Sequence, residues 1–206
     1  MTGMDQVRFW NRVAERYAAR PVRDVAAYEA MLAEISGRLR PEDRVLEIGA
    51  GTGSTALRLA PQVRLWLATD LSSEMHRIAC AKPGHASVQF RRAPADARHA
   101  EAPFDAICAF HILHLVPDAK ATLDALFAQL KPGGLLLSKT WCLADLPIWM
   151  KAILPLLRLR GWMPPAQALS APDLRAMITA AGFAIETERT FGKGAHSRYI
   201  VARKPG

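Results

Sequence analysis

The stretch VLEIGAGTGSTAL, Val45 to Leu57, decides the fold. An apolar run opens it, three glycines follow within five residues, and the stretch ends in residues that suit a helix. A strand, a glycine-rich turn and a helix in this order bring backbone N–H groups close to a ligand. We therefore expect this turn to form one wall of a ligand site.

The composition indicates one domain. The chain has 206 residues, of which 50% are hydrophobic, and this is enough for a single substantial core. The net charge of +8 comes mostly from scattered arginines, without a run of five or more basic residues. The charge alone therefore does not predict a nucleic-acid partner.

Cysteine usage and the N-terminal residues favour a cytoplasmic protein. Cys80, Cys108 and Cys142 are widely spaced and form no CxxC motif, so a reducing compartment is the simplest expectation. Residues 1–21 are charged and lack the apolar segment of a secretory signal. No apolar run reaches the roughly eighteen residues that a membrane span needs.

Hydrophobic periodicity predicts helices that alternate with strands. Two helices, over 5–19 and 25–39, precede the strand of the opening stretch. Beyond the glycine turn we expect strands at 63–70, 87–93, 104–110 and 135–141, with helices at 54–59, 71–81 and 118–130. The strands are apolar almost throughout, which is typical of a parallel sheet covered by helices on both faces.

The last part of the chain departs from this rhythm. A helix is expected over 170–182, with Ser170 as its N-cap and Gly182 at its end. Two alternating stretches, 183–192 and 197–204, follow without a helix between them, so they should form an antiparallel pair. The prediction is a Rossmann-like, doubly wound α/β sheet that is mostly parallel, with seven strands and an antiparallel C-terminal strand.

The expected organisation is a single domain, 1–206, in four parts. These are an N-terminal helical cap (1–40), a ligand-binding core (41–141), a substrate-side insert (142–169) and a C-terminal helix and strand pair (170–206).

The glycine spacing separates two classes of ligand. A dinucleotide-binding turn has the pattern G-x-G-x-x-G, whose third glycine lets the helix pack closely on the strand. Here Gly49, Gly51 and Gly53 give G-x-G-x-G, and Ser54 takes the place of that third glycine. Glu47 lies two residues before the first glycine, where a carboxylate would repel a pyrophosphate. A ligand with cationic sulfonium and amino groups is electrostatically better matched to such an acid.

The segment LEIGAGTG, 46–53, resembles the first motif of class I S-adenosylmethionine-dependent methyltransferases, which has the pattern acid-x-G-x-G-x-G. Asp70 stands at the end of the next strand, as in that family. Three later segments resemble family motifs in the correct order: APADARH (93–99), FDAICAFHILHLVPD (104–118) and LKPGGLLLSKT (130–140). The resemblance covers residues 40–140 closely and is to the small-molecule, type 11-like members.

This resemblance implies a site for S-adenosylmethionine, with S-adenosylhomocysteine as the product. Asp70 would hold both ribose hydroxyls, Asp96 would bind the adenine amino group, and Glu47 would lie at the cationic methionine end. The other residues expected at the cofactor are Tyr17, Gly49, Ala50, Gly51, Leu71, Met75, Ala95, Ala97 and Phe110. Core packing remains an alternative role for Tyr17 and Met75.

The expected chemistry is an in-line displacement from an activated donor, for which no metal is needed. His111, directly after the fourth predicted strand, is the candidate catalytic base, and a hydrogen-bonding role is its alternative. His111 and His114 have HxxH spacing, but no third ligand is in view, so we predict no metal site. Asp105, at the start of the fourth strand, is expected to be structural.

The insert 142–169 bears on the methyl acceptor. It is rich in apolar residues, tryptophans and prolines, with Lys151, Arg158 and Arg160 interleaved. One interpretation is an ordinary core helix under a proline-broken loop. Another is a lid over an apolar or aromatic small molecule. A related hypothesis is peripheral contact of this segment with an anionic membrane.

The main functional hypothesis is methyl transfer to an unidentified, apolar or aromatic small-molecule acceptor. The alternative from another class is a non-catalytic regulator that binds S-adenosylmethionine, because the implied acids concern binding alone. Ser54 and Glu47 argue against an NAD-dependent oxidoreductase. A base-methylating enzyme would carry Pro-Pro after the fourth strand, where FHIL stands at 110–113, so no nucleic-acid partner is expected. The oligomeric state is left open.

Overall fold

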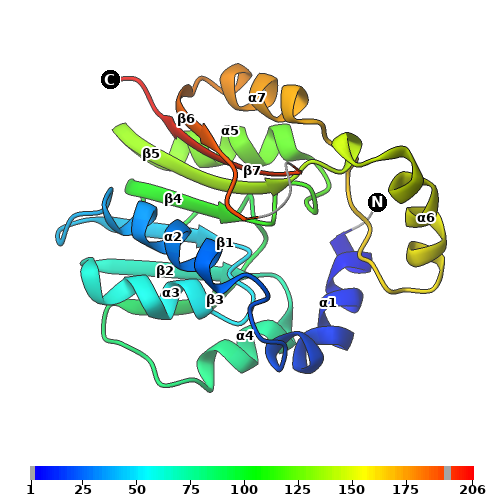
Figure 1. The fold of residues 1–206 in the computed structure, drawn as a ribbon. Coiled ribbons are helices and arrows are strands. Elements are labelled where there is room, and N and C mark those ends of the chain that lie inside the picture. Colours follow the sequence, from blue (N-terminus) through cyan, green and yellow to red (C-terminus); the bar gives the residue numbers. More distant parts are fainter. Residues whose placement is uncertain (1–2, 193–195) are drawn as a thin grey trace.

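A seven-stranded sheet lies at the centre of the protein, between two layers of helices (Figure 1). The computed structural model describes residues 3–192 and 196–206. The strand order is β3-β2-β1-β4-β5-β7-β6. The strands are β1 (Arg44–Ile48), β2 (Leu65–Asp70), β3 (Val88–Arg92), β4 (Phe104–Phe110), β5 (Leu130–Trp141), β6 (Ala184–Arg189) and β7 (Ser197–Arg203).

Strand directions confirm the predicted fold class. Strands β1 to β5 pair in parallel, and β7 runs antiparallel between β5 and β6. The strand order reverses between β1 and β4. Strands β2 and β3 lie on one side of β1, and β4 and β5 lie on the other. Ligands of open α/β sheets bind at such a point, beyond the carboxyl ends of the strands.

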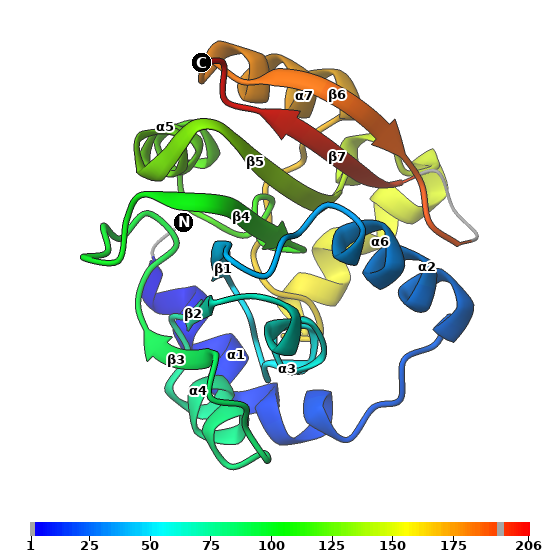
Figure 2. The ribbon, with the colours of Figure 1, turned by 90° about the vertical axis from the view of Figure 1, so that its left-hand side faces the viewer.

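The helices cover both faces of the sheet (Figure 2). They are α1 (Gly3–Ala18), α2 (Val25–Ser36), α3 (Ser54–Leu59), α4 (Ser73–Cys80), α5 (Ala119–Gln129), α6 (Ile148–Leu159) and α7 (Ala171–Ala180), with 3-10 turns at Ala60–Gln62 and Leu143–Asp145. Helices α5 and α7 pack on one face, and α2 and α3 pack on the other. Within the described residues, no helix is both long and apolar enough to cross a membrane.

Alternation along β1 divides its side chains between the two faces. Leu46 and Ile48 are fully buried against the α5 and α7 side, whereas Val45 is buried against the α2 and α3 side. Successive side chains of a strand point to opposite faces, so a nearly continuous apolar run is what a strand covered on both faces requires. Glu47 shares the face of Val45, and this places its carboxyl under helices rather than beyond the strand end.

Serine side chains cap two helices, and the predicted N-cap Ser170 is one of them. The Ser72 hydroxyl accepts a hydrogen bond from the Met75 N–H at the start of α4. Ser170 and Asp173 form a reciprocal capping box at the start of α7. These side chains satisfy N–H groups that the first helical turn leaves without a backbone partner.

Strand β5 differs from the sequence prediction, and the insert forms a helix that has no buried residue among those the structure describes and so is not a core helix. Strand β5 begins at Leu130, five residues earlier than expected, because Leu130 pairs with Phe104 before a register shift. The insert forms helix α6 although Pro155 lies inside it. Pro155 is exposed, so its ring faces solvent and not the packed interior.

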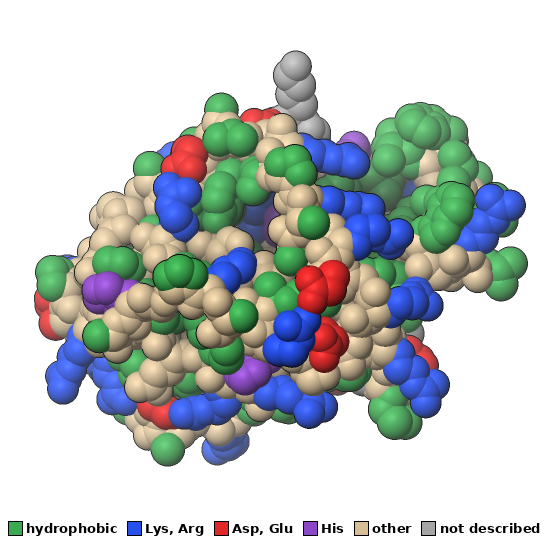
Figure 3. Space-filling view, turned by 90° about the horizontal axis from the view of Figure 1, so that it is seen from below, with side chains coloured by type: hydrophobic (Ala, Val, Ile, Leu, Met, Phe, Trp, Pro, Cys, Tyr) green, Lys and Arg blue, Asp and Glu red, His purple; other side chains and the backbone are tan. Residues whose placement is uncertain are grey.

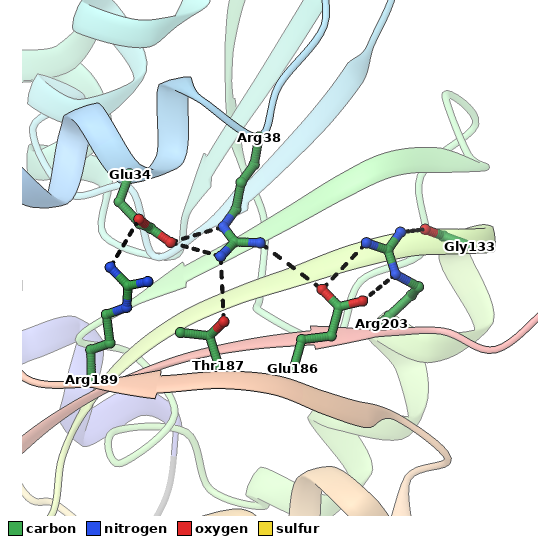
Figure 4. Close-up of polar contacts among 7 residues, drawn as sticks. All are labelled: Glu34, Arg38, Gly133, Glu186, Thr187, Arg189 and Arg203. Carbon is green, nitrogen blue, oxygen red and sulfur yellow. Dashed lines mark hydrogen bonds and ion pairs between the residues drawn. The ribbon is translucent and has the colours of Figure 1, made fainter.

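An ion-pair network ties the C-terminal strand pair to α2 (Figure 4). Arg38 donates to Glu34 at 2.7 Å and lies 3.9 Å from Glu186, while Arg189 reaches Glu34 at 3.3 Å. Arg203 pairs with Glu186 and also donates to the Gly133 carbonyl. The network joins segments that are 155 residues apart in sequence. Ion pairs at a protein surface each add little to the free energy of unfolding.

Asp105 has the structural role that the sequence predicted. Its carboxylate accepts the Arg44 N–H at 2.9 Å and the Lys131 ammonium at 2.6 Å. It therefore joins the starts of β1, β4 and β5, at the edge of the sheet opposite to the glycine turn.

Candidate active site

The glycine turn leaves β1 with three residues in the left-handed region. The φ angles are +64° at Gly49, +56° at Gly51 and +74° at Gly53, which side chains with a Cβ rarely adopt. A Cβ at Gly49 would lie 2.7 Å from Ile112, and one at Gly53 would lie 2.6 Å from Phe90. A Cβ at Gly51 would meet no described atom within 4 Å, so this glycine leaves open space beside the backbone.

Asp70 closes β2 and faces the glycine turn. Its Oδ2 accepts the Gly51 N–H at 2.8 Å, and its Oδ1 accepts the Ser72 N–H at 2.8 Å. Burial raises the pKa of Asp70, while the two backbone N–H donors act in the opposite direction. Each oxygen keeps a second lone pair, so the carboxylate can accept two further hydrogen bonds from a ligand.

A cavity of about 280 Å³ opens at the carboxyl ends of the first four strands. Nine of its lining residues were predicted to contact the cofactor: Tyr17, Gly49, Gly51, Asp70, Leu71, Met75, Ala95, Asp96 and Phe110. The candidate catalytic residue His111 also lines it. The structure therefore gathers most of the predicted site residues around one space, as the topology requires.

Three predicted cofactor residues do not line this cavity: Glu47, Ala50 and Ala97. Glu47 is buried, and its Oε2 accepts the Trp66 indole N–H at 2.9 Å. Burial raises the pKa of Glu47 to about 8, opposed by the Trp66 hydrogen bond, and the charge of Asp70 adds to the rise. The acid thus lies beneath the turn as a largely protonated group at neutral pH.

The backbones of Ala50 and Ala97 form hydrogen bonds that hold the segments around the cavity in place. The Ala50 N–H donates to the Thr69 carbonyl at 2.9 Å and fixes the turn to β2. The Ala97 carbonyl accepts the Gln129 amide at 3.0 Å, and the same Gln129 side chain accepts the His99 N–H at 2.9 Å. Gln129 thereby holds the loop that presents Asp96 at the rim.

Helix α1 covers the cavity from the side of α4. Trp10 and Tyr17 lie on its inner face with ring centroids 5.8 Å apart. Asn11 accepts a hydrogen bond of 2.6 Å from the Ser72 hydroxyl, next to Asp70. Burial raises the pKa of Tyr17, and the charges of Tyr28 and Asp70 add to this effect. The helix is therefore attached to the same backbone segment that carries Asp70.

His111 has an unusual backbone at the end of β4. Its φ angle is +56°, and its N–H donates to the Lys139 carbonyl at 2.6 Å. The side chain is exposed on the cavity side, while desolvation by the protein around it lowers the pKa of His111, with Lys139 and His114 adding to the effect. Water in the cavity offsets part of the desolvation, but the imidazole remains neutral at physiological pH. Strain of this kind in a non-glycine residue is often found at functional sites.

His114, the second histidine of the HxxH spacing, lies in the protein interior. It is buried, and burial lowers its pKa to about 4. In the part of the chain that the structure describes, no three His, Cys, Asp or Glu side chains lie close enough to hold a metal ion.

Several lining residues were not predicted. They are Gln6, Val7, Ser72, Ala93, Pro94, Ile112, Leu115, Val116, Pro117, Asp118 and Thr122. Gln6 could have been found from helical spacing, because it shares the face of Trp10 and Tyr17. Its buried amide donates to the Leu115 carbonyl at 2.9 Å and to the Pro165 carbonyl. Gln6 therefore ties α1 to the loop after β4 and to the end of the insert.

Comparison with known proteins identifies the class. A sheet of this order, with a glycine turn and an acid at the next strand end, defines a class I methyltransferase fold. A solved S-adenosylmethionine-dependent methyltransferase from Mesorhizobium loti superposes with a TM-score of 0.70 at 19% identity, covering 87% of this chain and 97% of that one. At this identity the likeness establishes the fold.

The family model described as "Methyltransferase domain" matches residues 15–188. The chain therefore belongs to this methyltransferase family, whose cofactor is S-adenosylmethionine. The cavity fits that cofactor, since Gly51 leaves room beside the turn and Asp70 presents a carboxylate there.

Two curated relatives match only in part. The ubiquinone biosynthesis O-methyltransferase of Xylella fastidiosa is 38% identical over 101 residues, which are 47% of this chain and 41% of the relative. The tRNA 5-carboxymethoxyuridine methyltransferase of Escherichia coli is 35% identical over 99 residues, 45% of this chain and 38% of the relative. The matches span less than half of each relative's length.

Proposed function

We propose that the chain transfers a methyl group from S-adenosylmethionine to an apolar or aromatic small molecule in the cavity. The observation that carries this proposal is the lining of the cavity, which has acids on one side and apolar side chains on the other. Asp70 and Asp96 lie on the side of the glycine turn, whereas Val7, Trp10 and Leu115 form an apolar wall from α1 and the loop after β4. A nucleoside is matched to the first side, and a hydrophobic acceptor is matched to the second.

The cofactor side is assigned to three groups of this chain. Asp70 would accept hydrogen bonds from both ribose hydroxyls, because each of its oxygens has a lone pair beyond its backbone bond. Asp96, exposed at the rim, would accept from the adenine amino group. Gly51 would let the ligand approach the backbone closely, since no side chain occupies that position.

The buried acid has a different role from the one the resemblance implies. Glu47 lies under the turn and is bonded to Trp66, so we assign it to support of the turn and not to direct contact with the cofactor. Its charge is suppressed by burial at neutral pH.

When bound, the cofactor supplies a methyl group that its positive sulfur already activates. The methyl group would pass to the acceptor atom, with the sulfur–methyl electron pair going to sulfur and the acceptor's proton released to solvent, while Asp70 and the turn at Gly51 would hold the cofactor. The protein must align the acceptor and exclude water. Trp10 and Tyr17 of α1 line the cavity on the side of this helix, and they would cover part of a bound acceptor.

His111 is assigned to positioning of the acceptor. A base works best when its pKa is near the working pH, and the surrounding protein lowers the pKa of His111 away from it. A neutral imidazole at the cavity wall can still donate or accept one hydrogen bond from an acceptor hydroxyl.

The test is a screen with S-adenosylmethionine labelled in its methyl group. Apolar phenols and quinone precursors are expected to become labelled, and bulk tRNA, the substrate class printed in the name of one relative, is not. Label in tRNA alone would overturn the small-molecule proposal. Tight binding of S-adenosylhomocysteine without label in any acceptor would favour the regulatory alternative.

A further inference from the structure

Helix α6 carries an apolar face that nothing in the described structure covers. No residue of this helix, which lies wholly within the described part of the chain, is buried. The side chains of Ile148 and Leu159, at its two ends, are 84% and 85% exposed. Trp149, Leu156 and the following Trp162 are also exposed. Such a contiguous exposed apolar patch marks an interaction surface.

The opposite side of α6 is packed against the wall of the cavity. Met150 and Leu154 contact a small cluster around Leu146 and Trp10. Trp10 also lines the cavity. Helical geometry therefore separates an inner face at Met150 and Leu154 from the outer apolar face, and the fold holds the helix in place while leaving that outer face free.

The charged residues within this segment of the sequence have one sign. No acidic residue occurs between Leu146 and Pro172, a stretch that contains Lys151, Arg158 and Arg160. Lys151 and Arg158 are seven residues apart and lie on the same flank of the helix, beside the apolar face. Each is exposed. Figure 3 shows the apolar side chains gathered on this protruding part of the molecule, with basic side chains next to them.

A hollow beside the end of α6 adds two arginines from α1. Arg12, Arg16 and Arg160 line it together with Val13, Gly161 and Trp162. Arg12 donates to the Gly161 carbonyl at 2.9 Å, and the Arg160 guanidinium lies 5.5 Å from the centroid of the Trp162 ring. Among the residues that the structure describes, no acidic side chain lines this hollow. Three guanidinium groups beside an aromatic ring are matched to a phosphate at an apolar boundary.

We propose that the outer face of α6 and this arginine hollow dock on an anionic phospholipid bilayer. The apolar face would enter the boundary between headgroups and acyl chains, and the arginines would contact lipid phosphates. Tryptophans near both ends of the helix are typical of such an interface. Helix α6 forms the outermost edge of the molecule (Figure 1), a convex shape that a flat bilayer accepts.

Other occupants are less well matched. A second copy would bring two basic surfaces together, and the like charges would repel. An acidic protein would have the right charge, but a convex helix with two apolar ends needs a groove to receive it. The docking goes beyond the proposed function and does not rest on it, because lipid binding requires neither cofactor nor acceptor.

The experiment is co-sedimentation of the full chain with vesicles, without cofactor or acceptor. Vesicles of phosphatidylglycerol and phosphatidylcholine should bind the protein, vesicles of phosphatidylcholine alone should bind it much less, and salt should weaken binding. Leu159→Ser should lower the affinity roughly tenfold, and Arg160→Ala should lower it about fivefold. Blue-shifted tryptophan emission on binding should be lost in a Trp149→Phe and Trp162→Phe double variant.

Matched controls separate docking from general charge and hydrophobicity. Val25→Ser, at a residue 58% exposed at the start of α2, and Arg64→Ala, at an exposed residue before β2, should leave vesicle binding unchanged. Absence of binding to anionic vesicles would overturn the proposal, as would equal binding by Leu159→Ser. Concentration-dependent dimerisation that Leu159→Ser abolishes, without vesicle binding, would assign the face to a second copy instead.

Discussion

The backbone N–H of Gly51 donates a hydrogen bond of 2.8 Å to Oδ2 of Asp70. This bond joins the glycine turn after β1 to the acid that ends β2. It fixes the turn and the carboxylate as one unit, with the remaining lone pairs of Asp70 available at the cavity. Two motifs 19 residues apart in sequence thereby form a single binding surface.

The glycines of the turn should respond differently to the same substitution. Gly51→Ala places a Cβ in open space, so only its left-handed backbone lowers the free energy of unfolding, by about 1–2 kcal/mol. The same Cβ should strongly weaken S-adenosylhomocysteine binding. Gly53→Ala adds a Cβ 2.6 Å from Phe90 and should destabilise the fold by about 3 kcal/mol or more. Denaturant unfolding and calorimetric titration measure the two effects. Unchanged affinity in Gly51→Ala would show that the ligand does not approach this turn.

Glu47 should make the protein less stable as the pH rises. Its pKa is about 8 when folded and 4.5 when unfolded, so the folded state holds a proton that the unfolded state has released. Stability from this group is complete below pH 4.5 and is lost as the pH rises to 8. Between pH 6.5 and 8 the loss is on the order of 2 kcal/mol. Glu47→Gln should remove this slope in denaturant unfolding measured across that interval, and an unchanged slope would contradict the burial of an acid here.

His114 should have the opposite effect at lower pH. Its pKa falls from 6.5 to about 4 on folding, so the unfolded state binds the proton more strongly. The stability contributed by the neutral, buried ring is complete above pH 6.5 and is lost as the pH falls toward 4. His114→Gln should give a shallower decline of unfolding free energy between pH 6.5 and 4.5. If the unfolding free energy of His114→Gln declines as steeply as that of the wild type, groups other than His114 cause the decline.

Gln6 should hold α1 over the cavity. Gln6→Ala removes the bonds to the carbonyls of Leu115 and Pro165 and should cost about 1–2 kcal/mol. Faster amide hydrogen exchange confined to α1, with weaker S-adenosylhomocysteine binding, is the expected result. Gln89→Ala, at an exposed position in β3, serves as the control. If amide hydrogen exchange in α1 is unchanged, contacts other than those of Gln6 hold this helix over the cavity.

The fold could be predicted largely from the sequence because its signals are local. The apolar run of β1, the caps Ser72 and Ser170, and the glycine spacing each act over a few residues. Parallel strands then bring their carboxyl ends together, so Asp70 and His111 were expected at one edge before their contacts were known.

Two of the unpredicted features depend on long-range packing, and a third on a local signal that was given too little weight. The extension of β5 rests on pairing of Leu130 with Phe104 across a bulge, which no local pattern encodes. The position of Glu47 follows from alternation along β1, a signal that was present in the sequence but was outweighed by the family motif. The role of Gln6 depends on carbonyls 109 and 159 residues away.

The most direct test of the account is calorimetric titration of S-adenosylhomocysteine, with NAD as the comparison ligand. The wild type should bind S-adenosylhomocysteine at one site and show no binding of NAD. Asp70→Ala should bind at least about tenfold more weakly, because two ribose hydrogen bonds to a charged acceptor are lost. Asp124→Ala, an exposed acid paired with Lys120, should bind as the wild type does. Equal affinity in wild type and Asp70→Ala, or binding of NAD in place of S-adenosylhomocysteine, would contradict the assignment of this cavity.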